Sequence, residues 1–213
     1  MGVINKGILG GVAGKVGNVV GGNCKGIDYL RSLPASVANP KTVKQQTQRT
    51  KFTTILNFLK PLTSLLAIGY KNYANGMTGF NVAMSYNVKN AITGTYPAFT
   101  VNYPVAQISR GNLTGAATPA VASTVARTIN FTWVNNAGTG NALATDTAIL
   151  VAFFPSSNEA VYQVTTIARS AAAGALTCPA KFSTKQAHCW LIFQTADGQL
   201  QANSAYIGTV TVV

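Results

Sequence analysis

The sequence predicts an α+β protein in which a glycine-rich N-terminal arm and a helical segment precede a seven-stranded β-sandwich of immunoglobulin or fibronectin type III type. Three observations support this prediction. Glycine and basic residues are frequent in residues 1–38. Apolar residues recur at a helical period of about 3.6 in residues 39–104, and the period changes to about 2 in residues 105–213. The three stretches are the expected arm, helical segment and sandwich.

The arm contains nine glycines before Ile27, with basic residues between them. Dense glycine costs backbone entropy on ordering, so we expect the arm to be held by neighbours, from its own domain or from another subunit. Apolar and polar residues alternate over residues 15–19. Such alternations favour short edge strands or a hairpin over a flexible linker, which would contain less Val and Ile. The arm is therefore predicted to be extended.

The helical segment begins with Asn39 and Pro40, which are typical of an N-cap followed by proline at the first helical position. Residues 41–51 are polar on every side of the predicted helix. This part should project into solvent or contact a partner. An apolar stripe with spacing i, i+3, i+4 and i+7 starts at Phe52 and predicts that the following turns are buried on one face.

Pro61 ends or kinks this first helix, because proline cannot continue the backbone hydrogen bonding. A second helical segment is predicted for residues 62–70 and a third for residues 77–92, each with apolar residues at helical spacing. Asn75 and Gly76 form a break between the two.

The C-terminal half reads as strands. Ile129, Phe131 and Trp133 alternate with polar residues, as in a strand with one buried face. Residues 147–154 are apolar on both faces, as in a central strand. The pattern and the turn residues indicate a sandwich, and a jelly roll or small barrel is the alternative. Further strands are predicted over residues 107–113, 161–168, 176–181, 187–195 and 203–213.

Charge is scarce and unevenly distributed. Charged residues make up 9% of the chain, against roughly 25% in a typical soluble domain. A surface with so few charges repels its own copies weakly, which favours assembly. Lys and Arg number 16 against four acids. Eleven of the basic residues and one acid lie in residues 1–109, so the arm and helices are strongly basic and the sandwich is nearly neutral.

The sequence lacks the residues that most enzyme reactions require. His188 is the single histidine, and strand alternation places it on one face with Trp190 and Ile192, as a packed or rim residue. No carboxylate pair has the spacing of a glycosidase, and residues 9–16 fail the Walker pattern at both ends. We expect a non-enzymatic protein without a cofactor, a metal site or a small-molecule substrate. Asp146 and Asp197 are expected to be turn residues.

Cys24, Cys178 and Cys189 form an odd set without a Cys-x-x-Cys pair, so each is expected to be a buried reduced thiol. A bridge between Cys178 and Cys189 remains open if their strands face each other. No classical signal peptide is evident at the N-terminus. The apolar runs are shorter than the roughly 18 residues of a membrane helix, so no membrane span is expected.

The basic side chains of the arm and first helix are the candidate contacts with a partner or with phosphate groups. A nucleic-acid site built from them would be independent of sequence. Stacking aromatic residues are sparse among them, however, which weakens that interpretation. The candidates are Lys15, Lys25, Arg31, Lys41, Lys44, Arg49 and Lys51.

Residues 14–20, with Lys25, Arg31 and residues 39–42, resemble an uncharacterised domain-of-unknown-function family of Bacteroidetes proteins of about this length. That resemblance extends to residues 204–208. Residues 1–60 also resemble phage-encoded structural proteins, through the glycine-rich start and an Asn-Pro-x-Thr helix opening. The second resemblance implies a virion or virion-like structural role, and neither supplies catalytic residues.

We therefore expect a structural subunit that forms a homo-oligomer, as a virion-like particle, a filament or a surface lattice. The N-terminal arm and the helices would make the contacts between subunits. The expected location is a virion or an extracellular assembly, with the chain in the cytoplasm before assembly. The alternative is a basic protein that binds nucleic acid without sequence preference. A third possibility is a module whose sandwich loops bind a carbohydrate or protein ligand.

Overall fold

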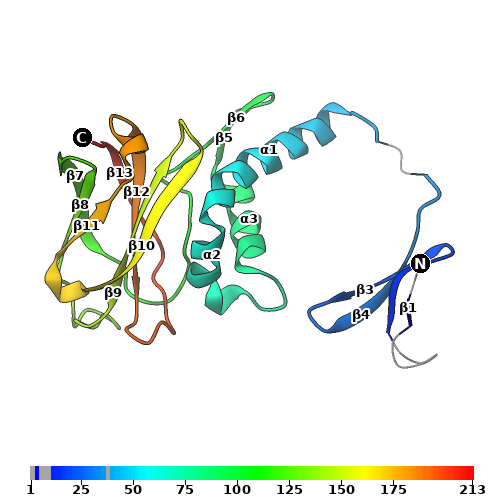
Figure 1. Ribbon diagram of the computed structural model, residues 1–213, viewed down its shortest axis with the longest axis horizontal. Coiled ribbons are helices and arrows are strands. Elements are labelled where there is room, and N and C mark those ends of the chain that lie inside the picture. Colours follow the sequence, from blue (N-terminus) through cyan, green and yellow to red (C-terminus); the bar gives the residue numbers. More distant parts are fainter. Residues whose placement is uncertain (1–2, 5–10, 37–38) are drawn as a thin grey trace. The chain divides into compact units, whose positions relative to one another are not determined.

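The computed structural model describes residues 3–4, 11–36 and 39–213. The chain divides into two compact units, Met1–Gln45 and Gln46–Val213. The first contains a four-stranded sheet, and the second combines helices with sheets of four, three and two strands (Figure 1). The predicted α+β class is confirmed.

The N-terminal unit is an antiparallel sheet with strands in sequence order, so the predicted extended arm with short strands is confirmed. Lys25 and Gly26 form the turn between the last two strands, with φ of 52° and 84°. Positive φ at both central residues is what a two-residue hairpin turn requires, and glycine adopts it without strain. The strands are β1 (Val3–Ile4), β2 (Val12–Val16), β3 (Val19–Cys24) and β4 (Ile27–Ser32).

The helices are α1 (Val43–Leu59), α2 (Thr63–Gly69) and α3 (Gly79–Asn90). The expectation that Asn39 and Pro40 open the first helix was wrong. Thr42 performs the capping instead, because its Oγ1 accepts the backbone N–H of Gln45 at 3.4 Å. The prediction that Pro61 interrupts the helix is confirmed, since a 3₁₀ turn (Lys60–Leu62) separates α1 from α2.

The chain after α3 turns into a β-hairpin that the periodicity did not predict. Strands β5 (Ile92–Thr95) and β6 (Ala98–Val101) pair in an antiparallel ladder. The third helix was expected to reach residue 92, but Ile92 already pairs with Val101. An apolar residue at helical spacing fits a following strand equally well, so periodicity could not locate this boundary.

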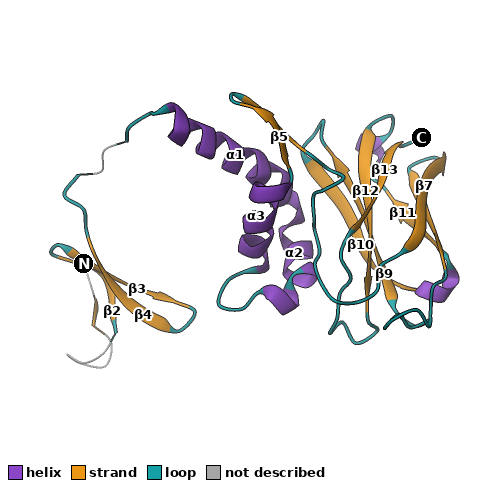
Figure 2. Cartoon of the chain, turned by 180° about the vertical axis from the view of Figure 1, so that it is seen from behind, coloured by secondary structure: helices purple, strands orange, loops and turns teal. Residues whose placement is uncertain are grey.

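The C-terminal strands form two antiparallel sheets that face one another (Figure 2). Their shared core contains Phe131 and Trp133 from one sheet and Leu150, Leu191 and Phe193 from the other. The four-stranded sheet has the order β10 (Glu159–Ala168), β9 (Thr147–Phe154), β12 (Gln186–Gln194), β13 (Ala205–Thr211). The three-stranded sheet has the order β11 (Ala173–Thr177), β8 (Thr128–Val134), β7 (Ala117–Val125).

A strand predicted over residues 107–113 does not form. The backbone there is held by side chains and by other loops: the Gln107 N–H donates to Asn87 Oδ1 at 3.0 Å, and the Ile108 N–H donates to Ser204 Oγ at 3.0 Å. The edge strand β7 takes its place in the sheet. It was missed because its half-buried face carries Ala117, Pro119, Val121 and Ser123, and Ala and Thr alternate with them on the exposed face, which gives a weak apolar alternation.

Strand β9 is buried on both faces. Its odd-numbered apolar residues, such as Val151 and Phe153, pack in a core shared with the helices, and Leu150 and Phe154 pack inside the sandwich. The Phe58 ring of α1 meets the Phe153 ring edge-on, with ring centroids 5.0 Å apart. The two-sided apolar pattern of residues 147–154 therefore reflects helices on one side and a second sheet on the other. Its prediction as a central strand is confirmed.

Within the described residues, one helical stretch, Val43–Gly69, is long enough for a membrane span and contains an 18-residue window with a mean hydropathy of 1.3. Ile55, Leu59 and Leu66 of this stretch are fully buried in the core beside the sheet. Length and composition alone are weak evidence, because a core helix passes the same test. The expectation of no membrane span stays a prediction.

Candidate interaction surface

The N-terminal sheet exposes large apolar side chains on both of its faces. Strand alternation places Ile27 and Tyr29 on one face of β4 and Leu30 on the other. Ile27 is 71% exposed and Leu30 is 62% exposed. Val16 and Val19 pair across β2 and β3 on the Leu30 face, and both are exposed.

The described residues of this sheet build no core of their own. Among its described residues only Gly21 is buried. A Cβ added at Gly21 would collide with the backbone carbonyl of Val12, so the strand passes too close to its neighbour for a side chain. The neighbouring Gly22 lies beneath the Tyr29 ring, whose Oη is 2.9 Å from the position of an added Cβ. Glycines thus bring the strands together but contribute no apolar side chains.

The seven candidate basic residues lie on the N-terminal sheet and along the start of the first helix. Lys15 and Arg31 both lie opposite Val20 in the strand ladders, so they share the face that carries Tyr29. Lys25 is in the β3–β4 turn. The remaining four lie along the start of the first helix: Lys41 precedes α1, and Lys44, Arg49 and Lys51 belong to it.

The polar beginning of α1 is exposed on most sides, as its sequence predicts, but it is braced by the β5–β6 hairpin. Tyr96 Oη donates to Gln46 Oε1 at 2.8 Å. Lys51 Nζ lies 5.2 Å from the centre of the Phe99 ring, a cation–π contact. Phe52, where the apolar stripe begins, is 51% exposed. This end of the helix therefore presents a polar and aromatic surface.

Few carboxylates balance the basic side chains. Asp28, the acid nearest to the arm lysines in sequence, accepts a hydrogen bond from Asn23 Nδ2 at 2.6 Å. Within the described part of the chain, Lys15, Lys25 and Arg31 form no ion pair. Their charges are available to an anionic surface.

His188 is a packed side chain, as its alternation predicts. It lies on the helix-facing side of β12 with Trp190. Its ring stacks on Tyr103 with centroids 3.7 Å apart, and its Nδ1 is 2.9 Å from Tyr206 Oη. Burial lowers the pKa of His188. Across residues 3–4, 11–36 and 39–213, no three His, Cys, Asp or Glu side chains gather in a way that would hold a metal ion.

The cysteines differ in environment. Cys178 and Cys189 are buried and free, and burial raises the pKa of the Cys189 thiol to about 12. Both lie in the sandwich core. The expectation that Cys24 is also buried was wrong, because it lies exposed at the end of β3.

Asp146 closes a turn, as expected, because its backbone N–H donates to the Leu143 carbonyl at 3.2 Å. The sequence did not indicate that its side chain is the fully buried partner of Arg169. Arg169 Nη2 is 3.1 Å from Asp146 Oδ2, and neither side chain has any exposed surface. The same carboxylate oxygen accepts the Leu143 N–H at 2.9 Å. The sequence did not reveal this pair, because Asp146 and Arg169 are separated along the chain by the strands β9 and β10.

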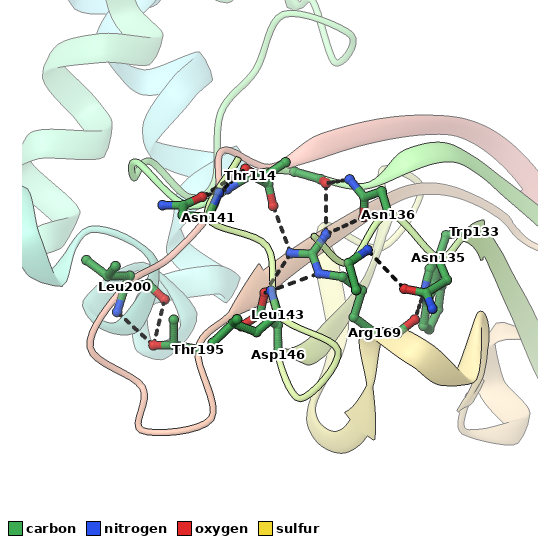
Figure 3. A network of polar contacts seen from close by, with 12 residues as sticks. Thr114, Trp133, Asn135, Asn136, Asn141, Leu143, Asp146, Arg169, Thr195 and Leu200 are labelled. Carbon is green, nitrogen blue, oxygen red and sulfur yellow. Dashed lines mark hydrogen bonds and ion pairs between the residues drawn. The ribbon is translucent and has the colours of Figure 1, made fainter. Parts of the chain in front are cut away.

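The Arg169 guanidinium joins several loops at one end of the sandwich (Figure 3). It donates to the carbonyl oxygens of Thr114 at 2.8 Å and Gly115 at 3.0 Å, and to Asn136 Oδ1 at 2.7 Å. Its face lies 3.9 Å from the centre of the Phe193 ring. These contacts use the donors of Arg169 within the protein, so the cluster organises the loops and has no free donor set for a ligand.

A search of curated proteins finds no match. The predicted membership of an uncharacterised family is supported by the family comparison, whereas the resemblance to Bacteroidetes and phage proteins stays a prediction. Residues 11–208 match a family of unknown function (DUF6266), and this span includes the described N-terminal sheet from residue 11 onward, the helices and most of both sandwich sheets. The chain therefore belongs to the DUF6266 family of unknown function.

Proposed function

We propose that this protein is a non-enzymatic structural subunit that assembles with copies of itself. The N-terminal sheet and the exposed start of α1 make the contacts between subunits. The assembly is a virion-like particle, a filament or a surface lattice, formed after synthesis in the cytoplasm. The observation that carries the proposal is a sheet with large apolar residues open on both faces and, among the residues that the structure describes there, no core beneath either face.

Such a sheet needs an apolar partner surface. Isolated sheets of a few strands are marginal in water, and segments of about 40 residues or fewer usually depend on disulfides, metals or oligomerisation. The cysteine of this sheet, Cys24, is free. Fully burying Ile or Leu contributes about 1.5–3 kcal/mol. Scaled by the exposed fractions of Ile27 and Leu30, these two residues would contribute about 2–4 kcal/mol per subunit interface.

The connection between the sheet and α1 is suited to exchange between subunits. Residues 33–42 contain no helix or strand where they are described. A fully extended connection of this length spans up to about 35 Å. Exchange of an identical element between protomers needs little additional structure, since the same surfaces are used within and between copies. The low charge of the chain reduces repulsion between the copies.

We also infer that the sandwich is of the fibronectin type III kind. Its strands, numbered in order from β7, correspond to A, B, C, C′, E, F and G. In a constant-type immunoglobulin domain the fourth strand pairs with E. Here the fourth strand, β10, pairs with β9 at the edge of the other sheet, which favours the fibronectin type.

The test compares two exposed leucines in the full chain. Leu30→Ser removes an apolar side chain from the sheet, and Leu143→Ser removes one with 59% exposure from a loop of the sandwich. We expect the wild type to form large species by light scattering and electron microscopy. We expect Leu30→Ser to raise the concentration needed for assembly about five- to thirty-fold, as a loss of about 1–2 kcal/mol implies, and Leu143→Ser to leave it unchanged.

A monomeric wild type at high concentration would contradict the proposal, and so would equal effects of the two substitutions. Deleting residues 1–38 should abolish assembly and leave the circular dichroism signal of the sandwich intact. Loss of folding together with loss of assembly would mean that the sheet serves its own chain.

The competing function is binding of nucleic acid without sequence preference. It is favoured by Lys15 and Arg31 on one face of the sheet, without ion pairs within the described residues. Affinity for a labelled oligonucleotide should then fall steeply with salt. Lys15→Gln or Arg31→Gln should each reduce the log–log salt slope by about one unit, whereas Arg127→Gln in the sandwich should not. Absence of binding at low salt would exclude this function.

A further inference from the structure

The unit Gln46–Val213 contains a pocket whose proposed role does not depend on the assembly of subunits. A surface pocket of about 360 Å³ opens along α3. Two tyrosines, Tyr73 and Tyr86, and two cations, Lys89 and Arg110, line it together with Met77 and Val82. We propose that this pocket, named here the Arg110 pocket, binds a small ligand in which a phosphate or carboxylate group is attached to an apolar or aromatic body.

Arg110 is held in place from two directions. Its backbone N–H donates to the carbonyl of Gly69 at 2.9 Å, at the end of α2. Its guanidinium carbon lies 5.0 Å from the centre of the Tyr73 ring and 5.7 Å from that of the Tyr86 ring. The Tyr73 hydroxyl donates to Asn112 Oδ1 at 3.3 Å, which fixes that ring. Aromatic contacts occupy the faces of a guanidinium and leave its N–H edge free for paired hydrogen bonds to an oxyanion.

The charge of the pocket is unbalanced. Lys89 and Arg110 are the charged residues of its lining, and both are positive. No acid of the described chain forms an ion pair with either of them. Both side chains are exposed. An incoming oxyanion would supply the missing negative charge and accept hydrogen bonds from the Arg110 edge.

Helix α3 supplies the rest of the pocket through its periodicity. Val82, Tyr86 and Lys89 have the spacing i, i+4 and i+7, so they lie on one side of the helix. Met77, in the loop before the helix, is 46% exposed and provides a flexible apolar wall. The pocket volume lies near the lower end of the range for small-molecule sites, roughly 300–1,000 Å³. It therefore suits a ligand of one ring with one charged group.

The test uses the full chain, with phenyl phosphate, benzoate and the neutral benzyl alcohol as probes, in calorimetric and NMR titrations at low salt. We expect saturable binding of at least one of the two anions and much weaker binding of the alcohol. Arg110→Gln should weaken anion binding at least about tenfold, as loss of a charge-assisted hydrogen-bond pair implies. Arg127→Gln removes the same charge from an exposed position in the β7–β8 turn and should change the affinity less than about twofold.

The relative affinities of phenyl phosphate and benzoate show whether the pocket prefers a phosphate or a carboxylate group. Equal losses in Arg110→Gln and Arg127→Gln would overturn the proposal, because they would indicate general attraction to a basic protein. Binding of benzyl alcohol as tight as that of the anions, or no saturation with either anion, would overturn it as well. If Arg110→Gln fails to fold, Lys89→Gln compared with Lys60→Gln tests the same pocket.

Discussion

The substitution Asp146→Asn tests whether the buried cluster at Arg169 holds the sandwich together. Asparagine has nearly the shape of aspartate, so the main change is the loss of the negative charge 3.1 Å from Arg169 Nη2. Burial lowers the pKa of Arg169, and the Asp146 carboxylate opposes that shift. Without the carboxylate, the guanidinium is a fully buried charge with neutral partners only. Breaking a buried pair by removing one partner typically destabilises a protein by about 3–5 kcal/mol.

The expected loss can be read from urea unfolding monitored by tryptophan fluorescence. Trp133 and Trp190 are both buried, one in the sandwich core and the other in the core shared with the helices. With a urea slope of about 1–3 kcal/mol per molar, the midpoint should fall by roughly 1–5 M. Glu159→Gln is the control. Its ion pair with Lys181 is exposed, and surface pairs contribute about 1 kcal/mol or less.

Equal midpoint shifts for Asp146→Asn and Glu159→Gln would refute the argument, because burial would then have no influence on the strength of the pair. The double variant Asp146→Asn with Arg169→Met is a further check. It removes both charges, so it should be more stable than Asp146→Asn alone if the unpaired guanidinium is the cause of the loss.

Three further outcomes are expected. In the native protein a thiol reagent should modify Cys24 rapidly and spare the two buried cysteines, whose pKa values are raised by burial; mass spectrometry showing three fast adducts would contradict this. Gly111→Ala should lower the free energy of unfolding by about 1–3 kcal/mol, because the new methyl group would collide with the carbonyl oxygen of Gln201, whereas Gly115→Ala has open space and should be nearly neutral in the same urea experiment. Burial lowers the pKa of His188 from 6.5, so the unfolded chain binds its proton more readily and the free energy of unfolding should fall as the pH drops below 6.5. His188→Asn should remove this part of the pH dependence, and an unchanged difference between pH 7.5 and 5.5 would show that other groups cause it.

Local sequence patterns predicted the helices and strands better than they predicted which elements pack against one another. Residues 147–154 were predicted as a central strand from two-sided apolarity, and β9 has those bounds and that place. The sequence did not reveal that helices cover one side of β9, because a continuous apolar run is the same whether sheet or helix lies opposite. Residues 107–113 show the converse: their apolar residues Ile108 and Leu113 are buried, but their backbone hydrogen bonds go to side chains and to separate backbone carbonyls rather than to a continuous strand ladder.

The candidate surfaces were predictable to different degrees. The exposed sheet could be anticipated from glycine density and short alternations, which leave too few side chains to form a core. That Lys15 and Arg31 share a face depends on strand register, which sets the facing pairs across β2, β3 and β4. The Arg110 pocket gave no signal in the sequence, since its residues come from a short turn, one helix and a later loop.

The sequence by itself determined the order of arm, helices and strands, the scarcity of charge and the shortage of catalytic groups, because these follow from composition and from periods of 2 and about 3.6 residues. Only the tertiary structure decided which charges meet. Arg169 reaches Asp146 and Arg110 reaches two tyrosine rings because packing of the sheets and helices brings distant segments together. Contacts of this kind depend on distances in space, and local sequence patterns carry no information about them.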